Sequence, residues 1–265
     1  MPNIMKKISA SFLLVIVVLF LVSWSQTGRP TSTYYQLTVY HYTSSEQEKI
    51  LDDYLEKAYI PAMHKLKIKT VGVFKAIAND TAALKKLYVL IPVRSLDILE
   101  KLPARLAADK DYQTNGAAYL NAIHTAPAYT RMETILLKAF SLAASLQLPS
   151  LKAGKNERVY ELRSYESATE KLFRNKVEMF NEGGEIGIFK KLNFNAIFYS
   201  EVIAGGKMPN LMYMTSFENM ADREAHWKSF GSDPDWKTLS AMPEYRNNVS
   251  HIDIMFLRPA AYSDY

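Results

Sequence analysis

Two groups of polar and aromatic residues in the second half of the sequence have types and spacing that suit ligand binding. The first group is Glu161, Arg163 and Tyr165, which alternate along a segment of strand-forming residues. Because successive side chains of a strand point to opposite faces, these three share one face. An arginine can bind an anion and a tyrosine can donate or accept a hydrogen bond. The alternative interpretation is a structural Glu161–Arg163 network that fixes how the two halves of the chain dock on each other.

The second group is His226, Trp227 and Trp236. A tryptophan-rich segment could close over a pocket, with His226 acting as acid or base near neutral pH. Alternatively, the two tryptophans anchor an irregular segment onto the helices through their large apolar area. Asp233 followed by Pro234 fits the first residues of a helix, which would account for the acidic character of this segment.

The remaining composition assigns no catalytic residue and predicts neither a metal site nor a cofactor. The sequence contains no cysteine, which excludes disulfides, thiolate metal sites and cysteine nucleophiles. None of its five histidines forms a His-Glu-x-x-His pattern, and it has no phosphate-binding Walker loop and no Gly-x-Ser-x-Gly turn.

Charge is equally unspecific. The 265 residues carry a net charge of +5, and 48% of them are hydrophobic, as in an ordinary globular protein. The basic doublets at Lys85–Lys86 and Lys190–Lys191 are isolated, whereas nucleic-acid-binding proteins concentrate charge on one face. We therefore predict no nucleic-acid partner.

The N-terminus has the pattern of an export signal. Lys6 and Lys7 precede an unbroken apolar run at residues 12–22, and Ser23 and Ser25 place small residues two apart. This pattern predicts a signal peptide at residues 1–25, followed by a short tail at 26–33. The run is short for a membrane span of roughly 20 residues, so an uncleaved membrane anchor is the alternative. The folded part is expected in the periplasm or outside the cell, with membrane contact only through this segment.

The rest of the chain contains two copies of one pattern. Residues 35–40 align with 160–165 at an offset of 125, and each segment is followed by a Ser-x-x-Glu capping box, beginning at Ser45 or at Ser167. Asp-x-Asp pairs at residues 109–111 and 233–235 align at an offset of 124. Each copy reads β-α-β-β-α-β, the ferredoxin-like order. The predicted units are residues 34–142 and 158–259, with a linker at 143–157 and a C-terminal tail at 260–265.

A four-stranded antiparallel sheet covered by helices on one face leaves its other face bare, so two such α+β repeats can pack sheet to sheet. Leu162 suggests that its own face meets the helices. The opposite face, with Glu161, Arg163 and Tyr165, would then point between the sheets, as would Gln36 and Tyr40 in the first copy. His41 would lie on the helix side, which argues against haem ligation between the sheets.

Several segments resemble the NIPSNAP family of the dimeric α/β-barrel superfamily. Residues 160–165 look like the family's opening strand, and residues 226–236 look like its aromatic and acidic segment near the second helix. The resemblance covers residues 34–142 and 158–259, and it implies an intramolecular version of the dimeric α/β barrel. The first copy departs from the pattern at Gln36, Thr38 and Tyr112. The family has no settled reaction, and the wider superfamily includes cofactor-free monooxygenases and haem proteins.

We therefore expect an exported protein of the NIPSNAP type that binds a small ligand or a protein partner, through the space between the sheets or the barrel surface. The expected ligand-binding residues are Glu161, Arg163, Tyr165, Tyr40, Gln36, His226, Trp227 and Trp236. The alternative is an enzyme that needs no metal or nucleotide and acts on a small organic molecule, monooxygenase-like by resemblance. A cavity of about 300–1,000 Å³ with Arg163 or Tyr165 on its wall would favour small-molecule chemistry. Further pairing of copies through sheet edges remains open.

Overall fold

The computed structural model describes residues 33–265, so the predicted signal peptide lies outside the described residues. No helix within the described range is both long and apolar enough to cross a membrane. The first repeat contains the strands β1 (Tyr34–Tyr42), β2 (Gly72–Ala76), β3 (Lys85–Val93) and β4 (Arg131–Ala139). Its helices are α2 (Ser45–Tyr54), a π-helical turn (Leu55–Tyr59), α3 (Ile60–Lys65), α4 (Leu96–Ala108), α5 (Lys110–Asn115) and α6 (Ala117–Leu120).

The second repeat has the same order. Its strands are β5 (Val159–Glu166), β6 (Asn195–Ala204), β7 (Asn210–Phe217) and β8 (His251–Pro259). Its helices are α7 (Glu170–Phe180), α8 (Glu185–Lys191), α9 (Met220–Ser232) and α10 (Pro234–Ala241). Short 3₁₀ turns at Ile77–Asp80, Ser141–Ala143 and Pro243–Tyr245 complete the elements. The predicted α+β fold with two ferredoxin-like repeats is confirmed.

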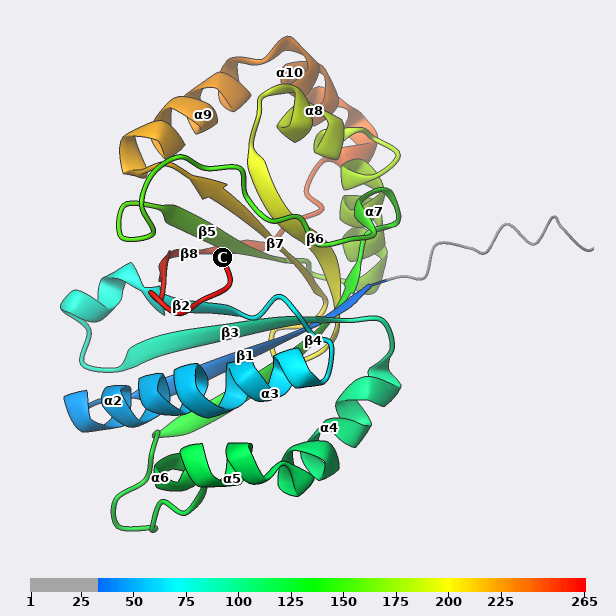
Figure 1. Cartoon of the computed structure of the whole chain (residues 1–265). Coiled ribbons are helices and arrows are strands. Elements are labelled where there is room, and N and C mark those ends of the chain that lie inside the picture. The colour runs from blue at the N-terminus through cyan, green and yellow to red at the C-terminus, as the bar shows by residue number, and fades with distance from the viewer. Residues whose placement is uncertain (1–32) are drawn as a thin grey trace, which may run out of the picture. The chain divides into compact units, whose positions relative to one another are not determined.

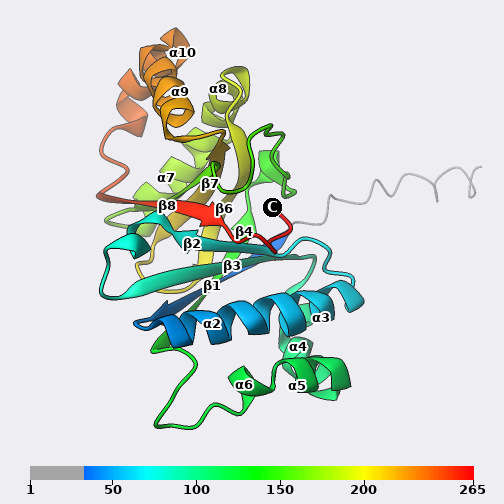
Figure 2. The same ribbon diagram turned by 60° about the vertical axis from the view of Figure 1, so that its left-hand side comes forward.

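The two sheets close into one barrel with the strand order β1-β3-β2-β8-β5-β7-β6-β4. All pairs are antiparallel, and β2 pairs with β8 while β4 pairs with β6, so each seam joins one repeat to the other. The helices of the first repeat cover one outer side and α7–α10 cover the opposite side (Figures 1 and 2). Closure satisfies sheet edges that two separate repeats would leave unpaired.

Apolar side chains from both repeats fill the barrel interior. Tyr35 of β1 packs on Phe198 of β6 with 5.2 Å between ring centroids, and Tyr160 of β5 packs on Phe74 of β2 at 4.9 Å. Each repeat thus contributes a tyrosine to a phenylalanine of the other. The C-terminal Tyr265 adds a third phenol, 5.4 Å from the Phe74 ring. The interior is therefore a packed core that locks the repeats together.

The predicted direction of the opening strands was wrong. Leu162 lies in the barrel interior, whereas Tyr165 and its neighbours on the alternate face lie beneath the helices. The same holds for β1, where Leu37 points inward and Tyr40 outward. By the same alternation His41 lies on the inward face, not on the helix side. The prediction failed because both faces of a closed barrel strand are buried, so an apolar residue does not identify the helix side.

The capping boxes begin elsewhere than predicted. Ser44, not Ser45, caps α2 by accepting a hydrogen bond from the amide of Gln47. Thr169, not Ser167, caps α7 by accepting one from Leu172. Neighbouring hydroxyl residues compete for the cap position, and sequence spacing alone does not decide between them.

The Asp-x-Asp pairs have the same structural role in both repeats. The first aspartate of each pair caps the following helix, Asp109 for α5 and Asp233 for α10. Each pair also binds a lysine. Lys191 at the end of α8 lies 2.6 Å from both Asp233 and Asp235, and Lys65 at the end of α3 lies 3.0 Å from Asp109 and 2.7 Å from Asp111. The motif therefore connects the end of α3 to the start of α5 in the first repeat, and the end of α8 to the start of α10 in the second. Helix capping explains its acidic residues.

Candidate functional site

The carboxylate of Glu161 is the centre of a buried polar cluster between β5 and α9. It accepts hydrogen bonds from Arg163 Nε at 2.5 Å, Arg223 Nε at 2.7 Å and Trp227 Nε1 at 2.8 Å. Arg223 Nη2 adds a further contact at 3.2 Å. Burial alone would raise the pKa of Glu161, but the hydrogen bonds of Arg223 and the charge of Arg163 outweigh it, so the pKa lies below its usual range. The residue is held as a carboxylate.

The guanidinium of Arg163 is engaged on several sides. Its Nε donates to Glu161, its Nη1 donates to the Tyr165 hydroxyl at 3.2 Å, and its plane lies 3.6 Å from the centroid of the Trp227 ring. The Tyr165 hydroxyl is also 2.9 Å from that of Tyr213 on β7. Stacking and forked hydrogen bonding are interactions that arginine provides and lysine does not.

A second buried ion pair lies between α7 and α8. Lys176 Nζ lies 2.7 Å from the carboxylate of Glu185, and both residues are buried. Burial raises the pKa of Glu185, while the charge of Lys176 opposes the rise. Gly184, at φ 90°, breaks the helix before Glu185 and lets α8 begin there.

These contacts describe a packed network. Glu161 is fully buried and pinned by three donor side chains, which makes it a poor proton acceptor. Arg223 and Trp227 belong to α9, so the network fixes that helix to β5. The arrangement matches the structural interpretation of the Glu161–Arg163 pair, with one difference. It anchors a helix to its own sheet and does not dock one repeat on the other.

The structure brings together only some of the predicted site residues. Glu161, Arg163, Tyr165 and Trp227 form the cluster just described. Trp236 packs on Phe230 at 4.5 Å and faces the Lys176 ammonium at 5.9 Å. His226 lies apart from them, with Nδ1 2.9 Å from the Asp222 carbonyl oxygen and its ring against Phe194 and Phe217.

Tyr40 and Gln36 belong to the other repeat and lie under its own helices. The Tyr40 hydroxyl accepts a hydrogen bond from Tyr119 at 3.2 Å. Tyr119 in turn stacks on Tyr54 at 3.8 Å. Gln36 donates only to Thr38 of the same strand. The first repeat therefore has an aromatic cluster where the second has charges.

Sequence analysis missed Arg223, Lys176, Glu185 and Tyr213. Arg223 precedes Trp227 by four residues, the spacing that places two side chains on one helical face. Lys176 interrupts the apolar face formed by Phe173 and Phe180. A lysine on the buried face of a helix needs a buried partner, so this position was a usable signal.

One group of potential metal ligands occurs in the described part of the chain. Glu166, His251 and Asp253 place ligand atoms within 4.8 Å of one another. The ammonium of Lys207 contacts Asp253 and lies 3.6 Å from Glu166. This lysine already supplies the positive charge that a metal ion would bring, so the group reads as a surface ion-pair network.

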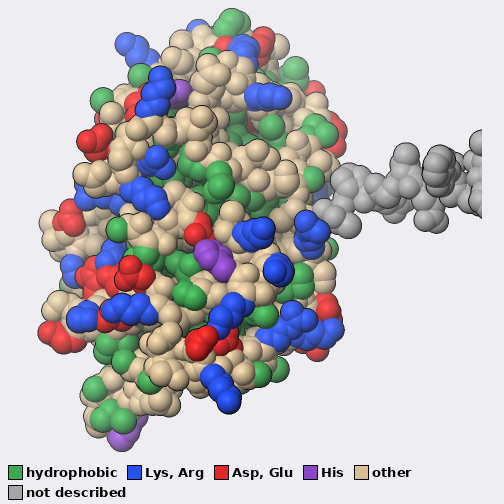
Figure 3. Space-filling view, in the orientation of Figure 1, with side chains coloured by type: hydrophobic (Ala, Val, Ile, Leu, Met, Phe, Trp, Pro, Cys, Tyr) green, Lys and Arg blue, Asp and Glu red, His purple; other side chains and the backbone are tan. Residues whose placement is uncertain are grey.

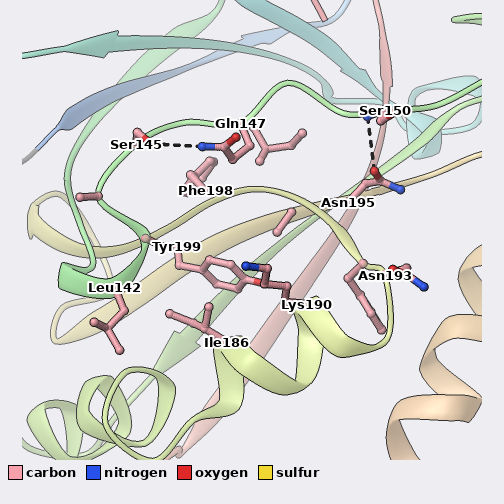
Figure 4. A pocket seen from close by; sticks show the side chains of 15 residues that line it. Leu142, Ser145, Gln147, Ser150, Ile186, Lys190, Asn193, Asn195, Phe198 and Tyr199 are labelled. Atoms are coloured by element: carbon pink, nitrogen blue, oxygen red, sulfur yellow. Dashed lines mark hydrogen bonds between the residues drawn. The ribbon is translucent and has the colours of Figure 1, made fainter.

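A groove of about 760 Å³ lies between the linker, α8 and the edge of β6 ahead of the residues that pair with β4 (Figure 4). We call it the linker groove. The linker follows this edge, because the amide of Gln147 donates to the Ile197 carbonyl and that of Ser150 donates to the Asn195 side chain. The groove is lined by apolar and uncharged polar side chains and one cation: Leu142, Ala143, Ala144, Ser145, Gln147, Ser150, Ile186, Lys190, Asn193, Phe194, Asn195, Ala196, Ile197, Phe198 and Tyr199. Neither Arg163 nor Tyr165 is among them.

Two solved structures share the fold over most of the chain. A proposed monooxygenase from Lactobacillus acidophilus matches with a TM-score of 0.54 and 13% identity, over 86% of this chain and 94% of that one. A proposed monooxygenase from Fusobacterium nucleatum matches with a TM-score of 0.55 and 6% identity, over 86% and 93%. At these identities the likeness shows the fold. No curated protein matches the sequence.

The family assignment comes from the second repeat. Residues 160–264 match the sequence model of the NIPSNAP family. A NIPSNAP-like domain protein from Burkholderia xenovorans is also found, at 17% identity and a TM-score of 0.37, over 41% of this chain and 90% of that one. The matched residues run from the opening strand, with Glu161 and Arg163, to the segment after β8. The second repeat, over residues 160–264, therefore contains a NIPSNAP domain.

Proposed function

We propose that this protein is an exported, non-catalytic binding protein that holds a small organic molecule in the linker groove. The observation that carries the proposal is the groove itself. Its volume of about 760 Å³ falls within the usual range of ligand sites. The barrel interior, where a ligand site was expected from the sequence, is occupied by side chains.

The lining of the linker groove suggests an amphipathic ligand. Leu142, which is 66% exposed, and Ile186 offer apolar surface. Asn193 and Asn195 offer amide donors and acceptors, and Lys190 offers one positive charge. A molecule with an apolar body and a carboxylate or amide group would match this combination.

Export is the second part of the proposal. It rests on the basic residues Lys6 and Lys7, the apolar run at residues 12–22 and the small residues that follow. An N-terminal membrane anchor would leave the folded part on the same side of the membrane.

Native mass spectrometry of the protein purified from the exported fraction of its own host tests both parts. We expect a chain beginning at Gln26 and an adduct of a few hundred daltons. In Ala144→Trp, which fills the groove, the adduct should be lost, whereas the matched variant Ala122→Trp on an exposed turn of the first repeat should keep it. An adduct retained in both variants would refute the groove as the site. Bare protein from every preparation would favour a protein partner instead.

A monooxygenase-like enzyme is the second candidate. It is supported by the names of the two fold neighbours that cover 86% of the chain. Oxygen uptake by the purified protein in the presence of small phenols would support it, provided that Ala144→Trp abolishes the uptake and Ala122→Trp does not.

A further inference from the structure

A second groove, in the first repeat, has a different chemical character. Its volume is about 650 Å³. It lies between the loop after α3, the end of β3 and α4, and the linker residue Leu146 forms part of its wall. We call it the basic groove, because four of its lining residues are cations: Lys67, Lys69, Arg94 and Arg105. Figure 3 shows several Lys and Arg side chains on this side of the molecule.

None of the four cations forms an ion pair with a carboxylate in residues 33–265. Asp97 on α4 pairs with Lys101 instead. Residues 1–32 contain no aspartate or glutamate. That segment therefore cannot supply a side-chain carboxylate to the groove. The four charges repel one another and would gain most from an anion that arrives from outside.

The second repeat provides an internal comparison. At an offset of 126, Lys67 and Lys69 correspond to Asn193 and Asn195, and Lys67 and Asn193 share a positive φ. At an offset of 124, Arg94 corresponds to Glu218. Arg105 corresponds to Ser229. The same place in the fold thus carries four positive charges in one repeat and one negative charge in the other. The fold does not require the cations, because the second repeat forms the same elements without them.

The base of the groove is apolar. Leu66, Ile68, Val93 and Ile98 line it together with Leu146. Cations around an apolar base match a molecule with a charged head and a short hydrocarbon body.

We propose that the basic groove binds a soluble amphipathic organic anion of the phosphate monoester type. The phosphate would lie among Lys67, Lys69 and the two arginines, with its hydrocarbon part on the apolar base. Arginine and lysine are the usual partners of phosphate groups. This site is separate from the linker groove, and the inference does not rest on the proposed function.

Calorimetric titration of the purified protein with n-hexyl phosphate tests the proposal. We expect saturable binding that weakens at least tenfold in K67N/K69N, which installs the residues of the second repeat. Lys67 has φ 67° and Asn193 has φ 57°, a conformation that asparagine tolerates, so this variant should fold. Arg94→Glu should weaken binding by a similar factor. The control K228N/K237N removes two exposed lysines from α9 and α10 and should leave the affinity unchanged.

Three comparisons complete the test. Neutral n-hexyl glucoside should bind at least tenfold more weakly than n-hexyl phosphate. Raising the salt concentration should lower the affinity for n-hexyl phosphate but not that for the glucoside. Equal affinity for inorganic phosphate would refute the role of the apolar base. Equal loss in K67N/K69N and in the control, or binding to phosphatidylglycerol vesicles without binding of n-hexyl phosphate, would overturn the assignment.

Discussion

Replacing Glu161 by glutamine tests whether the polar cluster anchors α9. The change keeps the size of the side chain but removes the charge that three donor side chains share. The side chain of Arg163 is only 10% exposed and would remain charged beside a neutral amide. Breaking a buried ion pair by removing one partner costs about 3–5 kcal/mol. For a domain of this size that is a fall in Tm on the order of 10 °C.

The first repeat supplies the matched variant. It has Gln36 and Thr38 at the positions of Glu161 and Arg163, so Glu161→Gln with Arg163→Thr installs a pair that this fold already tolerates. The double variant should be more stable than the single one, because it removes the buried guanidinium of Arg163 and leaves only Arg223, whose side chain is 18% exposed, without the carboxylate. Asp97→Asn, which breaks an exposed pair with Lys101, should cost about 0–1 kcal/mol.

Urea denaturation followed by circular dichroism measures all of these variants, with the slopes compared to check that unfolding remains two-state. A loss below about 1 kcal/mol for Glu161→Gln, by the same scale of buried pairs, would refute the anchoring role. So would a double variant that is no more stable than the single one.

Three other perturbations have defined outcomes. Lys176→Leu alone should destabilise the protein by about 3–5 kcal/mol in urea denaturation, whereas Lys176→Leu with Glu185→Gln should recover most of that loss; equal losses would contradict the pairing. Tyr35→Phe and Tyr160→Phe should each leave stability unchanged or raise it by about 1 kcal/mol, because both hydroxyls are buried without a hydrogen-bond partner in the described chain. A clear loss of stability in calorimetry would contradict this expectation and show that the hydroxyl is bonded, for example to internal water. Folding lowers the pKa of Glu161, so the ionised side chain should contribute to the free energy of unfolding above its unfolded pKa. That contribution should disappear as pH falls through the folded pKa. The stabilities of wild type and Glu161→Gln, measured as a function of pH, should therefore converge at low pH.

The architecture was largely predictable from the sequence, because the repeat fixed the order of elements twice. The alignment of residues 35–40 with 160–165 identified both opening strands, and the Asp-x-Asp pairs located both late helix starts. Each of these signals is local, so it survives without knowledge of the tertiary arrangement.

The site was less predictable, because it depends on which face of each strand points into the barrel and which points toward the helices. Leu162 and Arg163 are both buried, one by the barrel and one by α9. Hydrophobicity does not separate two buried faces, whereas it does separate a buried face from an exposed one. Two partners of Glu161, Arg223 and Trp227, also lie 62 and 66 residues further along the chain, separations that no local pattern encodes.

The closure of both barrel seams within one chain has a consequence for symmetry. In a pair of identical subunits every residue occurs twice, so a substitution that suits one side is imposed on the other. Here the pseudo-twofold axis relates positions that carry different residues. Glu161 of the second repeat is equivalent to Gln36 of the first, and Arg94 of the first repeat is equivalent to Glu218 of the second. A single polypeptide can therefore break the equivalence of its halves one position at a time, and each half is free to keep a separate chemistry on a shared frame.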